Sequence, residues 1–177
     1  MDMQPHSPAD EPGAILSGPL RRVADVMGAL GAVLVLALAL LINTDVVSRF
    51  VLNHPMKGVA ELVELSIVII VFVQLPTAIA TGGLIRSSEL HNSLNARHPA
   101  AGKAFAIVFE LVGVLIFALF AWGVWPRFIE AWNDGLYKGQ PGVFTAPTWP
   151  AELAIVVGAT VASLCFAASC IARVRRA

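Results

Sequence analysis

The chain has 177 residues, of which 57% are hydrophobic and 14% are charged, and its formal net charge is zero. These proportions, with a mean hydropathy of +0.76, lie outside the range of an ordinary water-soluble domain. The balanced charge gives no reason to expect a nucleic-acid partner. The length leaves no room for a soluble catalytic domain beside the apolar segments, so we expect no enzyme activity.

Four apolar runs without a charged side chain decide the fold class: residues 26–42, 65–79, 111–125 and 153–171. A bilayer core needs about 20 mostly apolar residues per helix, and each run reaches that length with its flanks. Backbone polar groups in hydrocarbon must bond within their own segment. We therefore expect an all-α integral membrane protein with four transmembrane helices and short interfacial helices.

The chain begins with residues 1–19, which are rich in Pro, Asp and Ser and are expected to form a flexible cytoplasmic tail. Residues 20–177 are expected to form one membrane domain. Its first helix is expected over residues 20–52, which is longer than a perpendicular crossing needs, so this helix should tilt. The long polar approach to it is unlike a signal peptide, so we expect the helix to remain in the mature protein.

The second helix is expected over residues 59–81, directly after the turn residue Gly58. Pro76 within it predicts a kink, because proline removes one helical hydrogen bond. In the following connection, residues 87–96 combine two leucines spaced by four with polar neighbours. This pattern predicts a short amphipathic helix on the inner membrane surface.

The third helix is expected over residues 104–125 and to end before Pro126. Beyond it, Phe128, Trp132 and Leu136 repeat at a spacing of four. This spacing predicts a separate interfacial helix on the outer surface, and its aromatic residues are candidates for an outer interface.

The fourth helix is expected over residues 153–171, after an irregular Gly- and Pro-rich return at residues 139–150 that includes Trp149 near its end. Ala154, Gly158 and Ala162 then repeat every four residues. Small residues at this spacing let another helix approach closely. Whether that helix belongs to this chain or to a partner is left open by the sequence.

The distribution of Lys and Arg predicts the orientation of the helices, because the richer side of a membrane protein usually faces the cytoplasm. One side carries eight of these residues: Arg21, Arg22, Arg86, Arg97, Lys103, Arg173, Arg175 and Arg176. The other carries four: Arg49, Lys57, Arg127 and Lys138. We expect both termini to be cytoplasmic and the four tryptophans, which flank the third connection, to form a belt at the outer surface.

Four charged residues near the first turn are candidates for more than a structural role. Asp45 and Arg49 lie four apart and can pair within the first helix. Glu61 and Glu64 share a face of the second, and the antiparallel hairpin predicts a salt bridge from Arg49 to Glu61. Three interpretations remain open: a structural clamp, a site for a transported cation or proton, and a contact with a partner subunit.

The sequence offers no candidate cofactor or metal site. All histidines lie in tails or connections, so no pair within the bilayer can hold a haem axially. The chain has no nucleotide-binding P-loop, no nucleophile elbow and no zinc-protease helix motif. We therefore expect neither a cofactor nor a metal.

Several short motifs occur in a fixed order between residues 20 and 172. They are Asn43 to Phe50, Gly58, Glu61-Leu62, Gly83 to Arg86, Pro147 to Pro150 and Gly158. Their order and spacing resemble the DctQ-type small membrane subunit of tripartite ATP-independent periplasmic (TRAP) transporters. One departure is the inner connection, where the family often has His-Ile-Arg-Val-Asp and this chain has Leu84 to Ser88, so no role of that His or Asp is carried over.

The resemblance implies a scaffold in the bacterial inner membrane. Its partners would be membrane lipid, a large DctM-type membrane subunit with the substrate and sodium sites, and a DctP-type periplasmic substrate-binding protein. The transported substrate would be an organic anion. Two alternatives remain: an independent small ion-coupled carrier or exporter using Asp45 or Glu61, and a membrane anchor for an unrelated complex.

Overall fold

The computed structural model describes residues 18–53, 56–81 and 99–175. It contains four long helices and a two-stranded antiparallel sheet: α1 (Pro19–Val51), α2 (Val59–Ala80), α4 (Pro99–Asn133), β1 (Tyr137–Gln140), β2 (Phe144–Pro147) and α5 (Trp149–Arg175). Each helix is long and apolar enough to cross a membrane, so the prediction of four spans is confirmed. Residues 1–17 of the expected tail and the expected helix at 87–96 lie outside the described residues.

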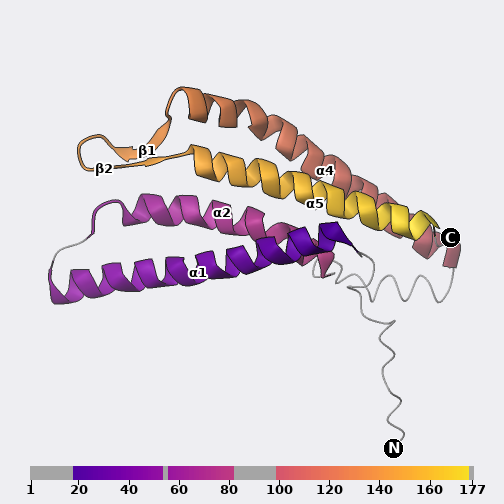
Figure 1. Cartoon of the computed structure of the whole chain (residues 1–177), viewed down its shortest axis with the longest axis horizontal. Coiled ribbons are helices and arrows are strands. Elements are labelled where there is room, and N and C mark those ends of the chain that lie inside the picture. The colour runs from indigo at the N-terminus through magenta and orange to yellow at the C-terminus, as the bar shows by residue number, and fades with distance from the viewer. Residues whose placement is uncertain (1–17, 54–55, 82–98, 176–177) are drawn as a thin grey trace, which may run out of the picture.

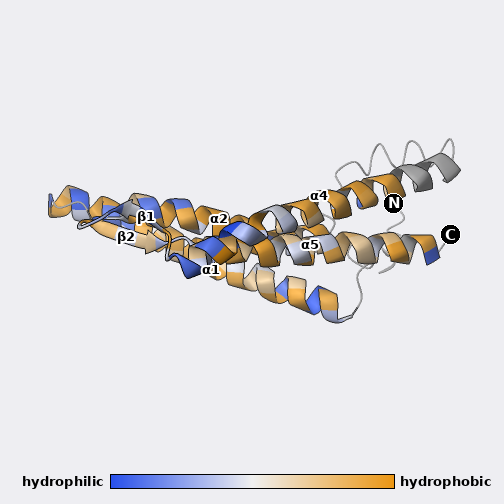
Figure 2. Ribbon diagram, turned by 90° about the horizontal axis from the view of Figure 1, so that it is seen from above, coloured by the Kyte–Doolittle hydropathy of each residue, from blue (hydrophilic) through white to orange (hydrophobic). Residues whose placement is uncertain are grey.

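The four helices lie side by side in one open layer, in the order α1, α2, α5, α4 (Figure 1). Their principal contacts join α1 to α2, α2 to α5, and α5 to α4. The inner helix α5 has 44% of its most apolar 18-residue stretch buried, whereas α1 and α4 at the edges have 6%. Apolar residues run along the helices and polar residues gather towards their ends (Figure 2). The layer therefore leaves broad apolar faces exposed.

We call the end of the layer that carries β1 and β2 the hairpin end, and the end where α1 begins and α5 finishes the tail end (Figure 1). The observed bounds of α1 differ by one residue at each terminus from the range expected from the sequence. The helix α2 begins at the expected residue and ends one residue earlier than expected. At the tail end, α4 begins at Pro99 rather than at residue 104, and α5 continues to Arg175 rather than ending at residue 171. At the hairpin end, the differences lie in the segment from Pro126 to Trp149.

The helix α4 continues through Pro126 to Asn133, so the expectation of a separate helix after this proline was wrong. Proline removes only one backbone hydrogen bond. Phe128 and Trp132 keep the helical spacing, and the ring of Trp132 packs against that of Trp149 on α5, with 5.1 Å between centroids. This contact between the two helices holds the last two turns of α4 in place.

The helix α5 begins at Trp149 rather than at residue 153. The carbonyl oxygen of Thr148 accepts hydrogen bonds from the backbone N–H groups of Ala151 and Glu152, at 3.1 and 3.2 Å. Pro150 is compatible with this start because the first turn of a helix does not use its N–H groups internally. The range expected from the sequence, residues 153–171, leaves this proline outside the helix.

The return segment forms a β-hairpin where an irregular connection was expected, which adds a small sheet outside the helical spans. Its turn places Pro141 and Gly142 at the two central positions, and the N–H of Val143 donates to the carbonyl of Gln140 at 3.1 Å. Gly142 has a φ of +84°, as a type II turn requires at its third residue. Proline followed by glycine is the sequence signal that predicts this turn.

Close approach between α5 and α2 depends on Gly158. A β-carbon placed on Gly158 would lie 2.2 Å from the carbonyl oxygen of Phe72. Ala162, one turn further along α5, is fully buried and belongs to the main apolar cluster, which includes Ile79 and Phe166. In this structure, therefore, Gly158 and Ala162 pack within the chain itself.

Candidate functional site

Asp45 is the most buried charged residue at the hairpin end, with 7% of its surface exposed. One carboxylate oxygen accepts a hydrogen bond from Arg49 Nη2 at 2.7 Å, and the other accepts one from the backbone N–H of Met56 at 3.1 Å. The side chain therefore ties the last turns of α1 to the connection that leads into α2.

The predicted salt bridge from Arg49 to Glu61 was wrong. Among the described residues, the ion pair of Arg49 is with Asp45, one turn away on the same helix. Glu64, one turn beyond Glu61, instead pairs with Lys138 on β1. Spacing along a helix identified the pair within α1, but it could not identify a partner that comes from the β-hairpin.

The β-hairpin packs onto the beginning of α2. The ring of Phe144 lies over Gly58, where a β-carbon would come within 2.1 Å of it. Gly58 also has a φ of +84°, so both its backbone conformation and the space available require glycine. Gly139 lies beside Glu61, with 3.6 Å from an added β-carbon to Glu61 Cγ. The α1–α2 pair and the α4–α5 pair are thus joined at the hairpin end.

An open pocket of about 620 Å³ lies between α2, α4, α5 and the β-hairpin. Its polar lining includes Arg127, Glu130, Lys138 and Glu152. Arg127 and Glu152 form an ion pair between α4 and α5 at 3.5 Å. The pocket therefore presents charges of both signs at the hairpin end. Local sequence patterns do not predict it, because its lining comes from four separate elements.

A ladder of aromatic rings follows the hairpin end of α4. Ring centroids are 5.9 Å apart between Trp125 and Phe128, 6.3 Å between Phe128 and Trp132, and 5.1 Å between Trp132 and Trp149. Trp132 is 61% exposed. The three aromatic residues singled out from the sequence therefore form one continuous surface, and tryptophan rings of this kind favour the membrane–water boundary.

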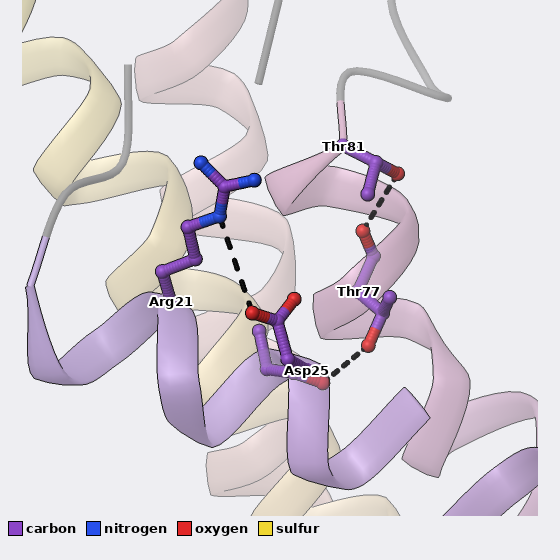
Figure 3. A network of polar contacts seen from close by, with 5 residues as sticks. Arg21, Asp25, Thr77 and Thr81 are labelled. Carbon is purple, nitrogen blue, oxygen red and sulfur yellow. Dashed lines mark hydrogen bonds and ion pairs between the residues drawn. The ribbon is translucent and has the colours of Figure 1, made fainter. Parts of the chain in front are cut away.

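The tail end carries a second polar network, between α1 and α2 (Figure 3). The hydroxyl of Thr77 donates to the carbonyl of Ala24, and Thr81 donates to the carbonyl of Thr77 at 2.9 Å. Arg21 and Asp25 approach to 4.0 Å on the exposed side of α1. Across the described residues, no group of three or more His, Cys, Asp or Glu side chains could hold a metal ion.

Comparison with known protein families shows to which family the chain belongs. The model of the DctQ component of tripartite ATP-independent periplasmic transporters matches residues 38–176, which is most of the chain. The chain belongs to the DctQ family. No curated protein and no solved structure matches it.

The resemblance inferred from the motifs is therefore confirmed, and this DctQ subunit is a small permease component of a TRAP transporter. Four apolar helices and the family together indicate a multi-pass membrane protein. The matched range includes the three ion pairs described at the hairpin end and the aromatic ladder. The departing inner connection, Leu84 to Ser88, lies outside the described residues.

In this DctQ subunit, we expect Thr77→Val to destabilise the α1–α2 contact by about 0.6 kcal/mol, because one hydrogen bond between membrane helices is lost while the side-chain volume is kept. The midpoint of thermal unfolding in mild detergent measures the effect. Thr160→Val is the matched control, since Thr160 donates to Val156 in its own helix. Equal losses in the two variants would contradict the role of Thr77 between helices.

Proposed function

We propose that this DctQ chain is a non-transporting scaffold in the bacterial inner membrane. It binds a large DctM-type subunit, which carries out sodium-coupled uptake of an organic anion delivered by a DctP-type periplasmic protein. The observation that carries this proposal is the open layer of four helices, which exposes wide apolar faces to the membrane. A face of this kind can bind another membrane protein or lipid.

The arrangement of charge supports a structural role for Asp45. Both of its oxygens are engaged, one by Arg49 and one by the N–H of Met56, and the carboxylate is buried. A site that binds and releases a cation needs a carboxylate that can exchange its partners. The alternative of an independent carrier using Asp45 or Glu61 is therefore less well supported than a clamp.

The distribution of Lys and Arg along the sequence supports placing the hairpin end at the periplasmic surface and both termini in the cytoplasm. In that orientation the aromatic ladder of Phe128, Trp132 and Trp149 faces the compartment of the substrate-binding protein. Tryptophan and arginine are enriched at protein-binding surfaces, and both Trp132 and Arg127 are exposed here. We propose that this surface contributes to docking of the DctP-type protein.

Reconstitution in liposomes tests the proposal. The purified chain alone is expected to give no uptake of labelled organic acids above empty liposomes, under an inward sodium gradient. Liposomes that also contain the large subunit are expected to take up substrate once the periplasmic protein is added. Uptake by this chain alone, at a rate comparable to the full system, would show that it is an independent carrier.

Co-purification provides the second measurement. Tagged chain extracted from its native membrane is expected to bring with it a larger polytopic membrane protein of transporter character. Recovery of a partner without transporter character would instead identify the chain as an anchor for another complex.

A further inference from the structure

An open groove of about 580 Å³ follows the seam between α1 and α2 in the tail-end half of the layer. Small residues form one wall, among them Gly28, Ala29 and Ala32 of α1. Gln74 of α2 lines the same groove. Ala29 and Ala32 are exposed in this chain, so nothing within the described residues covers that wall.

Gln74 lies well inside the span of α2. It is six residues from the helix end at Ala80 and fifteen from the start at Val59, about 9 Å and about 23 Å at the helical rise. The short side chain of glutamine does not reach the membrane surface from this depth. Its position is fixed by Gly31, where an added β-carbon would lie 2.3 Å from Gln74 Cγ.

The amide of Gln74 makes no hydrogen bond with any group in the described part of the chain. A primary amide has two donor hydrogens and one acceptor oxygen, and hydrocarbon offers no partner for them. An amide without hydrogen-bond partners inside a membrane raises the free energy of the protein. An occupant of the groove that forms hydrogen bonds with the amide of Gln74 would remove this cost.

We propose that this groove seats one transmembrane helix of the large transport subunit, and that this helix carries a hydrogen-bonding side chain level with Gln74. The inference rests on the proposed function, which supplies the partner. Small residues on α1 permit close approach of the helix backbone, and an interhelical hydrogen bond holds it in register.

Other occupants fit the groove less well. A lipid acyl chain has no hydrogen-bonding group, and a lipid headgroup does not lie at this depth. A second copy of the chain that met this one groove to groove across a twofold axis would bring two concave surfaces together, and any other arrangement of two copies is an outcome of the crosslinking test below. A single convex helix from a different chain satisfies both the shape and the amide.

Affinity capture with engineered variants tests this seat. Gln74→Leu keeps the side-chain volume but removes the amide, and it is expected to lower the amount of large subunit recovered with tagged chain by about threefold. Ala32→Leu fills the groove at a position exposed in this chain, and a larger loss is expected. Ala37→Leu is the matched control on the exposed surface of the same helix, outside the groove lining, and recovery is expected to stay at the wild-type level.

The two proposals fail in distinguishable ways. If the wild-type chain recovers no large subunit, the proposed function fails and the seat fails with it. If the wild-type chain and both groove variants recover it equally, the proposed function stands and the seat is overturned. Unfolding midpoints of all variants in detergent check that each chain is folded, and Ala32→Leu remains informative if Gln74→Leu is unstable.

Photo-crosslinking identifies the occupant directly. A photoreactive residue at position 32 is expected to attach to one helix of the large subunit, whereas the same residue at position 37 is expected to give little of that product. Attachment mainly to lipid, or to a second copy of this chain, would overturn the proposal.

Discussion

Replacing Gly158 with leucine is expected to destabilise the folded chain by about 3 kcal/mol and to separate α2 from α5. A β-carbon at this position would lie 2.2 Å from the carbonyl oxygen of Phe72 and 2.7 Å from its carbonyl carbon. These atoms belong to the backbone of a helix, so they cannot rotate away as the end of a flexible side chain could. The substitution forces one helix away from the other and weakens the contacts of the buried cluster.

The midpoint of unfolding in mild detergent measures the effect of Gly158→Leu. Gly123→Leu is the matched control, because a β-carbon on Gly123 meets nothing within 4 Å. That control is expected to retain or slightly raise the midpoint, since glycine is a poor helix former. A normal midpoint in the Gly158 variant would show that α2 and α5 do not meet as described.

Replacing Asp45 with alanine is expected to destabilise the α1–α2 hairpin by about 2 kcal/mol. The loss has two parts: Arg49 loses its ion-pair partner, and the backbone N–H of Met56 loses its acceptor. Because the Arg49 side chain is 63% exposed, water compensates much of the first part. The second part is less well compensated, because the carboxylate is largely buried.

Unfolding in detergent and capture of the large subunit together test the role of Asp45. Asp25→Ala is the control for the unfolding measurement only: Asp25 forms an ion pair at 4.0 Å with both side chains about half exposed, so almost no change in the unfolding midpoint is expected. Asp45→Asn is expected to have an intermediate effect. If Asp45→Asn left assembly and stability intact but abolished ion-coupled uptake, the clamp would be wrong and a carrier role would follow.

The spans of this protein were predictable because a bilayer imposes a minimum apolar length and a helical backbone. The Asp45–Arg49 pair was also predictable, since its two members are one turn apart on one helix. Both inferences need only local sequence. The confirmed family followed from the order of several weak motifs rather than from any single one.

The contacts that join the two helix pairs were not predictable in this way. Phe144 on Gly58 and Lys138 beside Glu64 bring together residues that are far apart in sequence. The predicted salt bridge from Arg49 to Glu61 was wrong for the same reason. Two residues at similar depth in a helical hairpin need not contact each other when other partners are also within reach. The continuation of α4 through Pro126 also depended on packing against α5.

The order α1, α2, α5, α4 has a consequence for biosynthesis. The strip on α2 that surrounds Phe72 is covered mainly by α5, the final helix of the described chain and the last of the four to leave the ribosome. Chains truncated before α5 would display this bare strip, which membrane quality-control proteases could recognise.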